Sequence, residues 1–290
     1  MQQVRGNLAD SYGPLLYAAT LNGTEMLSYP THKLVGTLSP PDELGSGCVD
    51  STNGNVLFVV GHLLLEYTFG QSQPTEEIHL SASASAETCA VDPLTGDLAV
   101  VFLYNGGSGY VGIFTNLSGE PSTYTVPGMG YYAYCGYDNK GDLFVDGQTQ
   151  GTSNETLLGE LTSGSQSFNT VALPEQVRAN LGGSVQWDGT SITVQGDDPL
   201  EIYRLAIHRS KAKLVGKVTL RTGSQFAADA PAMIQGNTVT MPLASGYLGE
   251  APDELGFWKY PKGGDPEHIW GRPIFKRGHV YQAFVNAGPQ

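Results

Sequence analysis

The sequence predicts an all-β fold assembled from a repeated unit, and three observations support that prediction. One phrase occurs three times, at residues 48–59, 89–100 and 135–145, and each copy has a Cys, an apolar segment, a turn built on Asp and Gly, and a second apolar segment. Each copy has the sequence pattern of a β-hairpin. The copies follow one another at roughly 40 to 50 residues, which is typical of propeller blades. No segment shows a convincing helical period. Together these observations predict a six-bladed β-propeller with four strands in each blade.

The outer strands of each blade follow from the alternation of apolar and polar residues that marks a half-buried strand. Third strands are predicted at residues 26–30, 64–69, 110–114, 157–161, 201–205 and 255–260. Fourth strands are predicted at residues 33–38, 77–81, 122–126, 167–173, 213–220 and 267–271. Six third strands and six fourth strands indicate six blades.

The first strands indicate how the ring closes. They open five blades, at residues 47–50, 88–92, 134–138, 184–188 and 232–235. The first blade begins directly at its second strand, residues 15–19, so its innermost strand must come from another part of the chain. Residues 279–285 have the right length and alternation, and they follow a sixth blade that is already complete. We therefore expect the C-terminal strand to join blade 1, which removes an exposed sheet edge; a frayed tail is the alternative.

One domain is expected to contain the whole chain, residues 1–290. A single core of this length is unusual, but repeat architectures avoid that limit because each unit packs only on its neighbours. Residues 1–11 are expected to form a loose arm. The expected blades are 12–41 with 276–285, then 42–82, 83–128, 129–174, 180–224 and 226–275.

The charge balance restricts the partners. The chain has 28 acidic and 15 basic residues and a formal net charge of −13, which disfavours nucleic acid and anionic membrane surfaces. No run of about 18 apolar residues is present that would insert into a membrane. The basic residues cluster at 204–221 and 259–277, in the last two blades. We expect a carbohydrate or protein ligand, and self-association stays open.

Composition favours a secreted or periplasmic protein. Lys is scarce, Thr, Ser, Gly and Tyr are abundant, and Asn-x-Ser/Thr sequons stand at Asn22, Asn116 and Asn154. The residues after Met1 lack the apolar centre of a signal peptide, so this expectation treats the chain as the mature part of an exported protein.

The three cysteines cannot all pair with one another. Cys89 and Cys135 stand three residues before the turn Asp of their repeats, and Cys48 stands two before its own. We interpret all three as compact apolar side chains of buried strands, because a free Cys behaves in that way. A disulfide between neighbouring inner strands is the main alternative, and no spacing resembles a zinc or haem motif.

The phrases at residues 138–146 and 92–100 resemble the D-x-x-G-N-L-Y-V-A-D signature of NHL-repeat propellers. The chain, with Tyr-Pro pairs at 29–30 and 260–261, is similar to uncharacterised secreted propellers of environmental bacteria. The resemblance covers residues 12–285, although blades 5 and 6 depart from the signature. It implies a fold rather than one activity, since the family includes lyases, gluconolactonase-like hydrolases and binding scaffolds.

A site is expected at the channel mouth, among the loops that lead into first strands and those between second and third strands. The resemblance to gluconolactonase-like propellers implies a divalent cation such as calcium, held by carboxylate and amide oxygens and able to polarise a lactone carbonyl. The candidate ligands by register are Glu43, Glu87, Asn105 and Asp229, with Asp146 as a further oxygen donor. Acidic loop residues that are only solvated are the alternative. The histidines placed to act as a general base are His279 and His62.

Aromatic residues offer a second kind of site at the same mouth. Exposed rings stack on sugars or peptide side chains through their apolar faces, although strands also favour rings for packing. The predicted ligand-binding residues are Tyr131, Tyr132, Tyr134, Asp146 and Tyr247. The Asp of each turn is instead expected to cap its own hairpin, at Asp50, Asp92, Asp138 and Asp188.

Familiar catalytic signatures are absent: there is no nucleophile elbow, zinc-protease motif or phosphate loop, and the six His are scattered. The leading interpretation is therefore an exported recognition or scaffold propeller that binds a carbohydrate or protein at its channel face. The first alternative is a divalent-metal-assisted lactonase-like hydrolase or lyase with its site in the central channel. The second is a self-assembling extracellular structural subunit.

Overall fold

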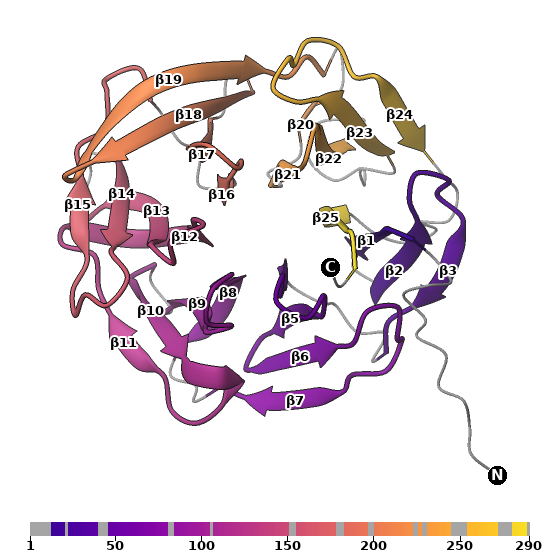
Figure 1. Ribbon diagram of the computed structural model, residues 1–290, viewed down its shortest axis with the longest axis horizontal. Coiled ribbons are helices and arrows are strands. Elements are labelled where there is room, and N and C mark those ends of the chain that lie inside the picture. Colours follow the sequence, from indigo (N-terminus) through magenta and orange to yellow (C-terminus); the bar gives the residue numbers. More distant parts are fainter. Residues whose placement is uncertain are drawn as a thin grey trace.

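The chain forms a ring of six blades around a central channel, as the computed structural model in Figure 1 shows. The structure describes residues 13–20, 23–39, 46–80, 84–104, 107–150, 155–177, 183–196, 200–222, 226–227, 231–244, 254–271 and 280–288. Within this part of the chain, every blade is an antiparallel sheet whose first strand lies beside the channel and whose last strand lies at the rim. The predicted fold class is confirmed.

The strands follow one another blade by blade. Blade 1 takes β1 (Leu15–Thr20), β2 (Gly23–Ser28) and β3 (Leu34–Thr37); blade 2 has β4 (Gly47–Val49), β5 (Val56–Val60), β6 (Leu63–Tyr67) and β7 (Glu76–His79). Blade 3 has β8 (Ser85–Val91), β9 (Leu98–Leu103), β10 (Gly109–Phe114) and β11 (Ser122–Tyr124), with a short 3-10 helix, η1 (Thr115–Leu117), between its last two strands. Blade 4 has β12 (Met129–Tyr137), β13 (Leu143–Thr149), β14 (Thr156–Leu161) and β15 (Asn169–Val171). Blade 5 has β16 (Val185–Trp187), β17 (Ile192–Gly196), β18 (Glu201–His208) and β19 (Lys211–Thr219). Blade 6 has β20 (Phe226–Ala227), β21 (Met233–Gln235), β22 (Thr238–Ala244), β23 (Glu254–Lys259) and β24 (His268–Gly271), and β25 (Val280–Asn286) comes last.

The ring closes through the C-terminal strand, as predicted. Blade 1 has the order β25-β1-β2-β3, so β25 is its innermost strand. It runs antiparallel to β1, with Leu15 opposite Asn286 and Ala19 opposite Gln282. The Phe284 ring stacks on Tyr17 with the centroids 5.5 Å apart, and both side chains are buried. The strand therefore contributes to the core as well as to the hydrogen-bonded sheet.

The core is distributed between the blades. Among the described residues, buried apolar side chains form six clusters, one at each junction of neighbouring blades. In β5, for example, Phe58 faces blade 1 while Leu57 and Val59 face blade 3. Successive strand residues point to opposite faces, so both faces of a blade must be apolar where it packs on two neighbours. This packing explains the nearly continuous apolar runs in the second strands.

The turn between first and second strands is fixed by its Asp. Asp50, Asp92, Asp138 and Asp188 each accept a hydrogen bond through Oδ1 from the backbone N–H two residues ahead. The predicted capping role is confirmed. These turns form the turn side of the ring; the loops that lead into first strands and join second to third strands form its opposite, loop side.

Three local features differ from the sequence prediction. The innermost edge of blade 6 is divided, since β20 and β21 both pair with β22. The Tyr-Pro pairs at 29–30 and 260–261 lie in turns after β2 and β23 rather than in these strands, because Pro has no N–H to donate to a sheet. Both Tyr-Pro peptide bonds are cis. Cys48 and Cys89 form a disulfide, so their interpretation as free thiols is wrong and the alternative holds. Cys135 is free and buried, as interpreted.

No helix in the described ranges is long and apolar enough to cross a membrane.

Candidate functional site

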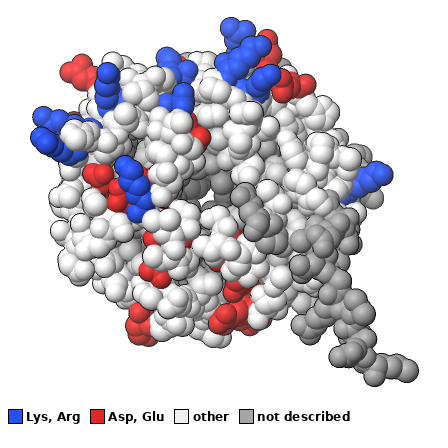
Figure 2. Space-filling view, viewed as in Figure 1, with Lys and Arg blue, Asp and Glu red and all other residues white. Residues whose placement is uncertain are grey.

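The central channel contains a cavity of about 400 Å³ that the innermost strands of all six blades line. Figure 2 shows the molecule hollowed at its centre. Of the described residues that line the cavity, Asp138 is the only one with a charged side chain. Its Oδ1 accepts hydrogen bonds from the backbone N–H groups of Lys140 and Asp142, so this carboxylate is engaged in its own turn. Apart from this carboxylate, the described lining of the cavity is apolar or neutral polar.

The turn side of the cavity carries an aromatic ring beside two amides. Trp187 of blade 5 is half-buried, and its neighbours around the channel are Asn139 of blade 4 and Gln235 of blade 6. The side chains of Asn139, Gln235 and Ser51 of blade 2 are exposed to solvent. The Trp187 ring packs in part against the apolar cluster between blades 4 and 5. Its exposed part offers an apolar contact, and the amides on the neighbouring blades offer hydrogen bonds to the same ligand.

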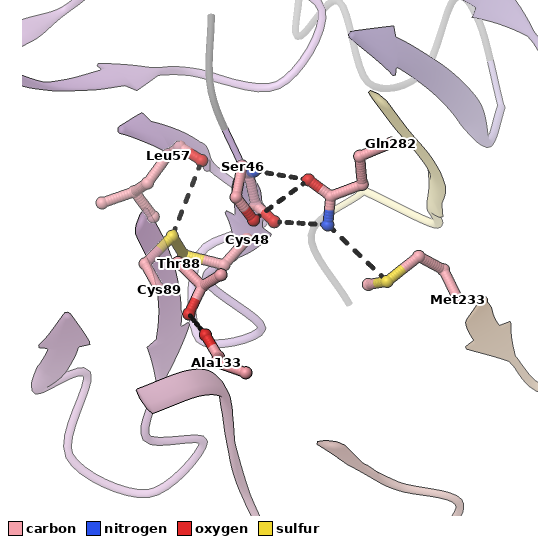
Figure 3. Close-up of a disulfide and its surroundings, with 9 residues drawn as sticks. Ser46, Cys48, Leu57, Thr88, Cys89, Ala133, Met233 and Gln282 are labelled. Carbon is pink, nitrogen blue, oxygen red and sulfur yellow. Dashed lines mark hydrogen bonds between the residues drawn. A yellow bond between two sulfur atoms is a disulfide. The ribbon is translucent and has the colours of Figure 1, made fainter. Parts of the chain in front are cut away.

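The channel wall is held together by links between successive inner strands. Gln282 of β25 reaches blade 2, where its Oε1 accepts from the Gly47 N–H at 2.6 Å and its Nε2 donates to the Gly47 carbonyl at 3.1 Å (Figure 3). The Cys48–Cys89 disulfide joins blade 2 to blade 3. Thr88 Oγ1 donates to the Ala133 carbonyl of blade 4 at 3.1 Å. These links bring four blades to a fixed spacing around the cavity.

Blades 4, 5 and 6 are joined on the same circle. Blade 4 approaches blade 5 at Gly136, where a Cβ would lie 2.3 Å from the Val185 carbonyl oxygen, so only Gly fits. The Gln186 amide of blade 5 then bonds two backbone groups of blade 6, donating to the Ala232 carbonyl and accepting from the Ile234 N–H. The cavity is thus a preformed site with a rigid wall, as ligand sites commonly are.

The loop side holds several of the residues predicted from the sequence. Tyr134 lines the cavity, and Tyr131 lies close enough to Glu87 and Asp146 for both carboxyls to act on it. Burial raises the pKa of Tyr131, and Glu87 and Asp146 raise it further. Tyr131, Tyr134, Glu87 and Asp146 therefore lie around one place, the junction of blades 3 and 4.

Asp146 is the most perturbed carboxyl of this group. It is 1% exposed, and its Oδ1 accepts from the Tyr134 N–H at 2.7 Å. Its Oδ2 is buried without a hydrogen-bond partner. Burial raises the pKa of Asp146 to about 7, against the opposing effect of the Tyr134 hydrogen bond and of its own N–H.

Other predicted residues lie elsewhere. Tyr132 is buried, and its hydroxyl accepts from the Val126 N–H at 2.8 Å, so it is part of the core. His62 is exposed in the turn between β5 and β6 and does not line the cavity. The remaining candidates lie outside the described residues: Glu43, Asn105, Asp229, Tyr247 and His279. Within the part of the chain that the structure describes, no three His, Cys, Asp or Glu side chains gather as metal ligands.

The charges are distributed unevenly. Most Lys and Arg on the face drawn in Figure 2 lie in its upper half, over blades 5 and 6. Asp188 joins blades 5 and 6: Arg204 Nε of its own blade donates to Asp188 Oδ2 at 2.6 Å, and Tyr260 of blade 6 donates to the same oxygen at 2.5 Å. Asp188, Arg204 and Tyr260 are not among the residues that line the cavity.

The ligand site was expected on the loop side, and Asn139 and Gln235 were not among the predicted residues. A signal for them was present in the repeat. Gln235 pairs with the first residue of the following strand, as Trp187 does in blade 5, and Asn139 directly follows its turn Asp. By register Tyr137 is the residue of blade 4 that matches Trp187 and Gln235, and Asn139 lies two residues further into the turn. These positions were therefore readable as lying on the turn side.

Comparison with known proteins supports the fold. No family model matches the chain, and no curated protein matches it. A protein of unknown function from Bacteroides caccae is 16% identical over 94% of this chain and 99% of its own, with a TM-score of 0.64. A chain from the crystal structure of a nidogen/laminin complex is 10% identical over 96% of this chain and 100% of its own, with a TM-score of 0.70. The Cps50 (Swd1) β-propeller domain of Myceliophteria thermophila is 11% identical over 89% of this chain and 83% of its own, with a TM-score of 0.58. At such identities the likeness shows the fold alone, so NHL-repeat identity and a secreted bacterial origin stay predictions, and what is shown is a six-bladed β-propeller.

Proposed function

We propose that this chain is an exported recognition propeller that binds a neutral carbohydrate in its central channel. The observation that carries the proposal is the turn-side arrangement in which Trp187 has Asn139 and Gln235 as its neighbours around the cavity. A sugar ring has an apolar face formed by C–H groups and an edge of hydroxyls that both donate and accept. The indole suits the face, and the amides, each with donors and an acceptor, suit the edge.

The neutrality of the cavity supports the same ligand class. A charged substrate would need a counter charge, because an unpaired ion loses its hydration on entering a cavity. Asp138 is the single charged side chain among the described lining residues, and its turn already engages it. A neutral sugar requires no such partner. The volume of about 400 Å³ lies within the usual range of small-molecule sites.

The disulfide supports export. Disulfides persist in oxidising compartments such as the periplasm and the extracellular space and are rare in reducing cytosol. Cys48 and Cys89 are paired next to the cavity, so a secreted or periplasmic location suits both the link and an extracellular sugar.

A glycan array with matched variants tests the proposal. The wild-type chain is expected to bind a set of neutral glycans, and Trp187→Ala is expected to lose them because the stacking face is gone. Leu94→Ala is the control, since this residue is 63% exposed in the turn of blade 3 and does not line the cavity. Binding that survives Trp187→Ala contradicts the site. An array without binding to the folded wild type contradicts the ligand class and leaves a protein segment as the alternative.

A further inference from the structure

The outer hairpin of blade 5 is longer than the outer hairpins of the other blades in the described ranges (Figure 1). In blade 5, the third strand β18 lies opposite the first residue of the second strand at Leu205, and it continues to His208 before β19 begins at Lys211. Residues 206–213, which we call the tip hairpin, therefore extend beyond this row on the turn side of the ring. In the other five blades the third strand ends at the equivalent row, at Ser28, Tyr67, Phe114, Leu161 and Lys259. The propeller fold does not require the extension.

One face of the tip hairpin packs on the ring and the other face is open. Ile207 and Ala212 pack against the apolar cluster between blades 4 and 5. The backbone is fastened at the same place, since Ala172 of blade 4 donates its N–H to the Ser210 carbonyl and accepts from the Ala212 N–H, both at 2.9 Å. The cross-strand neighbours on the open face are all exposed, with Ala206 opposite Lys213 and His208 opposite Lys211. The open face is thus presented on a fixed frame.

The tip hairpin gathers basic groups that have no acidic partner. Arg209, Lys211 and Lys213 are exposed, and within the part of the chain that the structure describes none of them makes a salt bridge. Further along β19, in contrast, Lys217 pairs with Glu201 at 2.6 Å. Lys211 and Lys213 are two residues apart on one strand, so their side chains leave the same face about 7 Å from each other. Like charges at this spacing repel each other, and a bound anion relieves the repulsion.

The turn of the tip hairpin places a third basic side chain where small residues are favoured. Arg209 and Ser210 are its two central residues, and both have positive φ, 48° and 56°. A two-residue turn of this kind favours Asn and Gly, because a larger side chain crowds the backbone at positive φ. Arg209 is therefore a poor choice for the turn alone, and it adds a guanidinium beside the ammonium groups of β19.

The outer edge of β19 is unsuited to pairing with a further strand. Ala172 bridges Lys211 at one end of β19, and Gly264 bridges Leu220 just beyond the other end. Between them the register with β18 shifts and leaves Val215 unpaired as a bulge. Occupied ends and a bulge disfavour the addition of a strand, so a peptide partner gains few main-chain hydrogen bonds here. What the tip hairpin offers a partner is its three cationic side chains.

We propose that the tip hairpin is a docking surface for an acidic polysaccharide, whose carboxylate or sulfate groups contact Arg209, Lys211 and Lys213. Such a polymer carries anions at regular intervals and binds by charge, without a pocket or a free sheet edge. The net charge of −13 does not prevent this, because at physiological ionic strength exposed charges more than about 8 Å apart are largely screened. The three residues do not line the channel cavity, so the proposal holds whatever ligand the channel takes.

Binding of the full-length protein to immobilised polygalacturonate and dextran sulfate, with neutral dextran as the blank, tests the proposal and distinguishes carboxylate from sulfate. Binding to either polyanion supports it, and three charge contacts predict that Kd rises about 20-fold between about 50 and 200 mM NaCl. Lys211→Gln combined with Lys213→Gln is expected to raise Kd about tenfold or more at the lower salt concentration.

Two controls separate this surface from other causes of binding. Lys33→Gln combined with Lys259→Gln removes the same charge from exposed positions on blades 1 and 6 and is expected to keep the wild-type Kd. Trp187→Ala is also expected to keep it, because the channel site is not involved.

Three results would overturn the proposal. The first is a folded wild type that binds neither polyanion at the lower salt concentration. The second is an equal loss of affinity in the two pairs of Lys variants, because overall charge would then account for the binding. The third is tighter binding of an acidic peptide, poly-glutamate, than of either polysaccharide, which would assign the surface to a protein partner.

Discussion

Replacing Cys48 and Cys89 together by Ser is expected to lower the free energy of unfolding by about 4 kcal/mol, because the disulfide closes a loop in the unfolded chain. The two cysteines are separated by 41 residues in sequence and lie on the innermost strands of blades 2 and 3. The open chain regains the conformations that this closure forbids, so the unfolded state gains entropy and the folded state loses relative stability.

The magnitude follows from the loop length. A closed loop of 41 residues corresponds to an entropy of about 13 cal/mol/K, or about 4 kcal/mol at 25 °C. With an unfolding entropy of about 2.1 cal/mol/K for each of 290 residues, the melting temperature is expected to fall by about 6 °C. The two Ser hydroxyls lie in a nearly buried position and add a smaller loss if they find no partner.

Urea unfolding followed by tryptophan fluorescence measures this change in three samples: oxidised wild type, wild type reduced with a phosphine, and the double variant. The reduced protein and the variant are expected to unfold at similar urea concentrations, both below the oxidised protein. Cys135→Ala is the control, because this cysteine is buried but unpaired, and its loss does not reopen a loop. Equal stability of oxidised and reduced wild type would refute the reasoning, since reduction adds no new side chain.

Further predictions concern the closing strand, the contact of blades 4 and 5 at Gly136, and the acid limit of stability. Phe284→Ala removes a buried ring that stacks on Tyr17 and is expected to cost about 3–5 kcal/mol in urea unfolding; a cost below about 1 kcal/mol would show that β25 does not close the ring. Gly136→Ala places a Cβ 2.3 Å from the Val185 carbonyl oxygen and is expected to cost about 1–3 kcal/mol, and an unchanged urea midpoint would contradict this contact. Burial raises the pKa of Asp188, but hydrogen bonds from Tyr260, Arg204 and Thr190 outweigh it and hold the value at about 2. Stability from this group is therefore present above about pH 4 and lost as pH falls toward 2, so Asp188→Asn is expected to flatten acid unfolding, and an unchanged acid profile would count against it.

Much of the fold was predictable because one unit repeats. The Asp-Gly turn marks where each hairpin reverses, and the apolar runs after it mark the buried second strands, so strand order followed once the unit was recognised. The closing strand was predictable from a count, since blade 1 lacks a first strand and residues 279–285 have the pattern of one. The divided inner edge of blade 6 was not, because Phe226–Ala227 is too short to show an alternation.

The site was less predictable, because it depends on which parts of different blades meet. The disulfide illustrates this: Cys48 and Cys89 stand at different distances from their turn Asp, so the repeat pattern does not show that they meet, yet the structure pairs them. Asp146 was singled out as a ligand oxygen, yet its Oδ1 supports a bulge in β12 that no local pattern announces. On the turn side, Trp187 comes from blade 5, while Asn139 and Gln235 come from blades 4 and 6.

Calorimetric titration of the neutral glycan that the array selects, into wild type and into Trp187→Ala, tests the proposed recognition most directly. Loss of a stacking ring worth at least about 1.4 kcal/mol predicts that Kd rises tenfold or more in the variant, while Leu94→Ala keeps the wild-type value. Equal affinity of the wild type and Trp187→Ala, with both proteins folded, would contradict a carbohydrate site on the turn side of the channel.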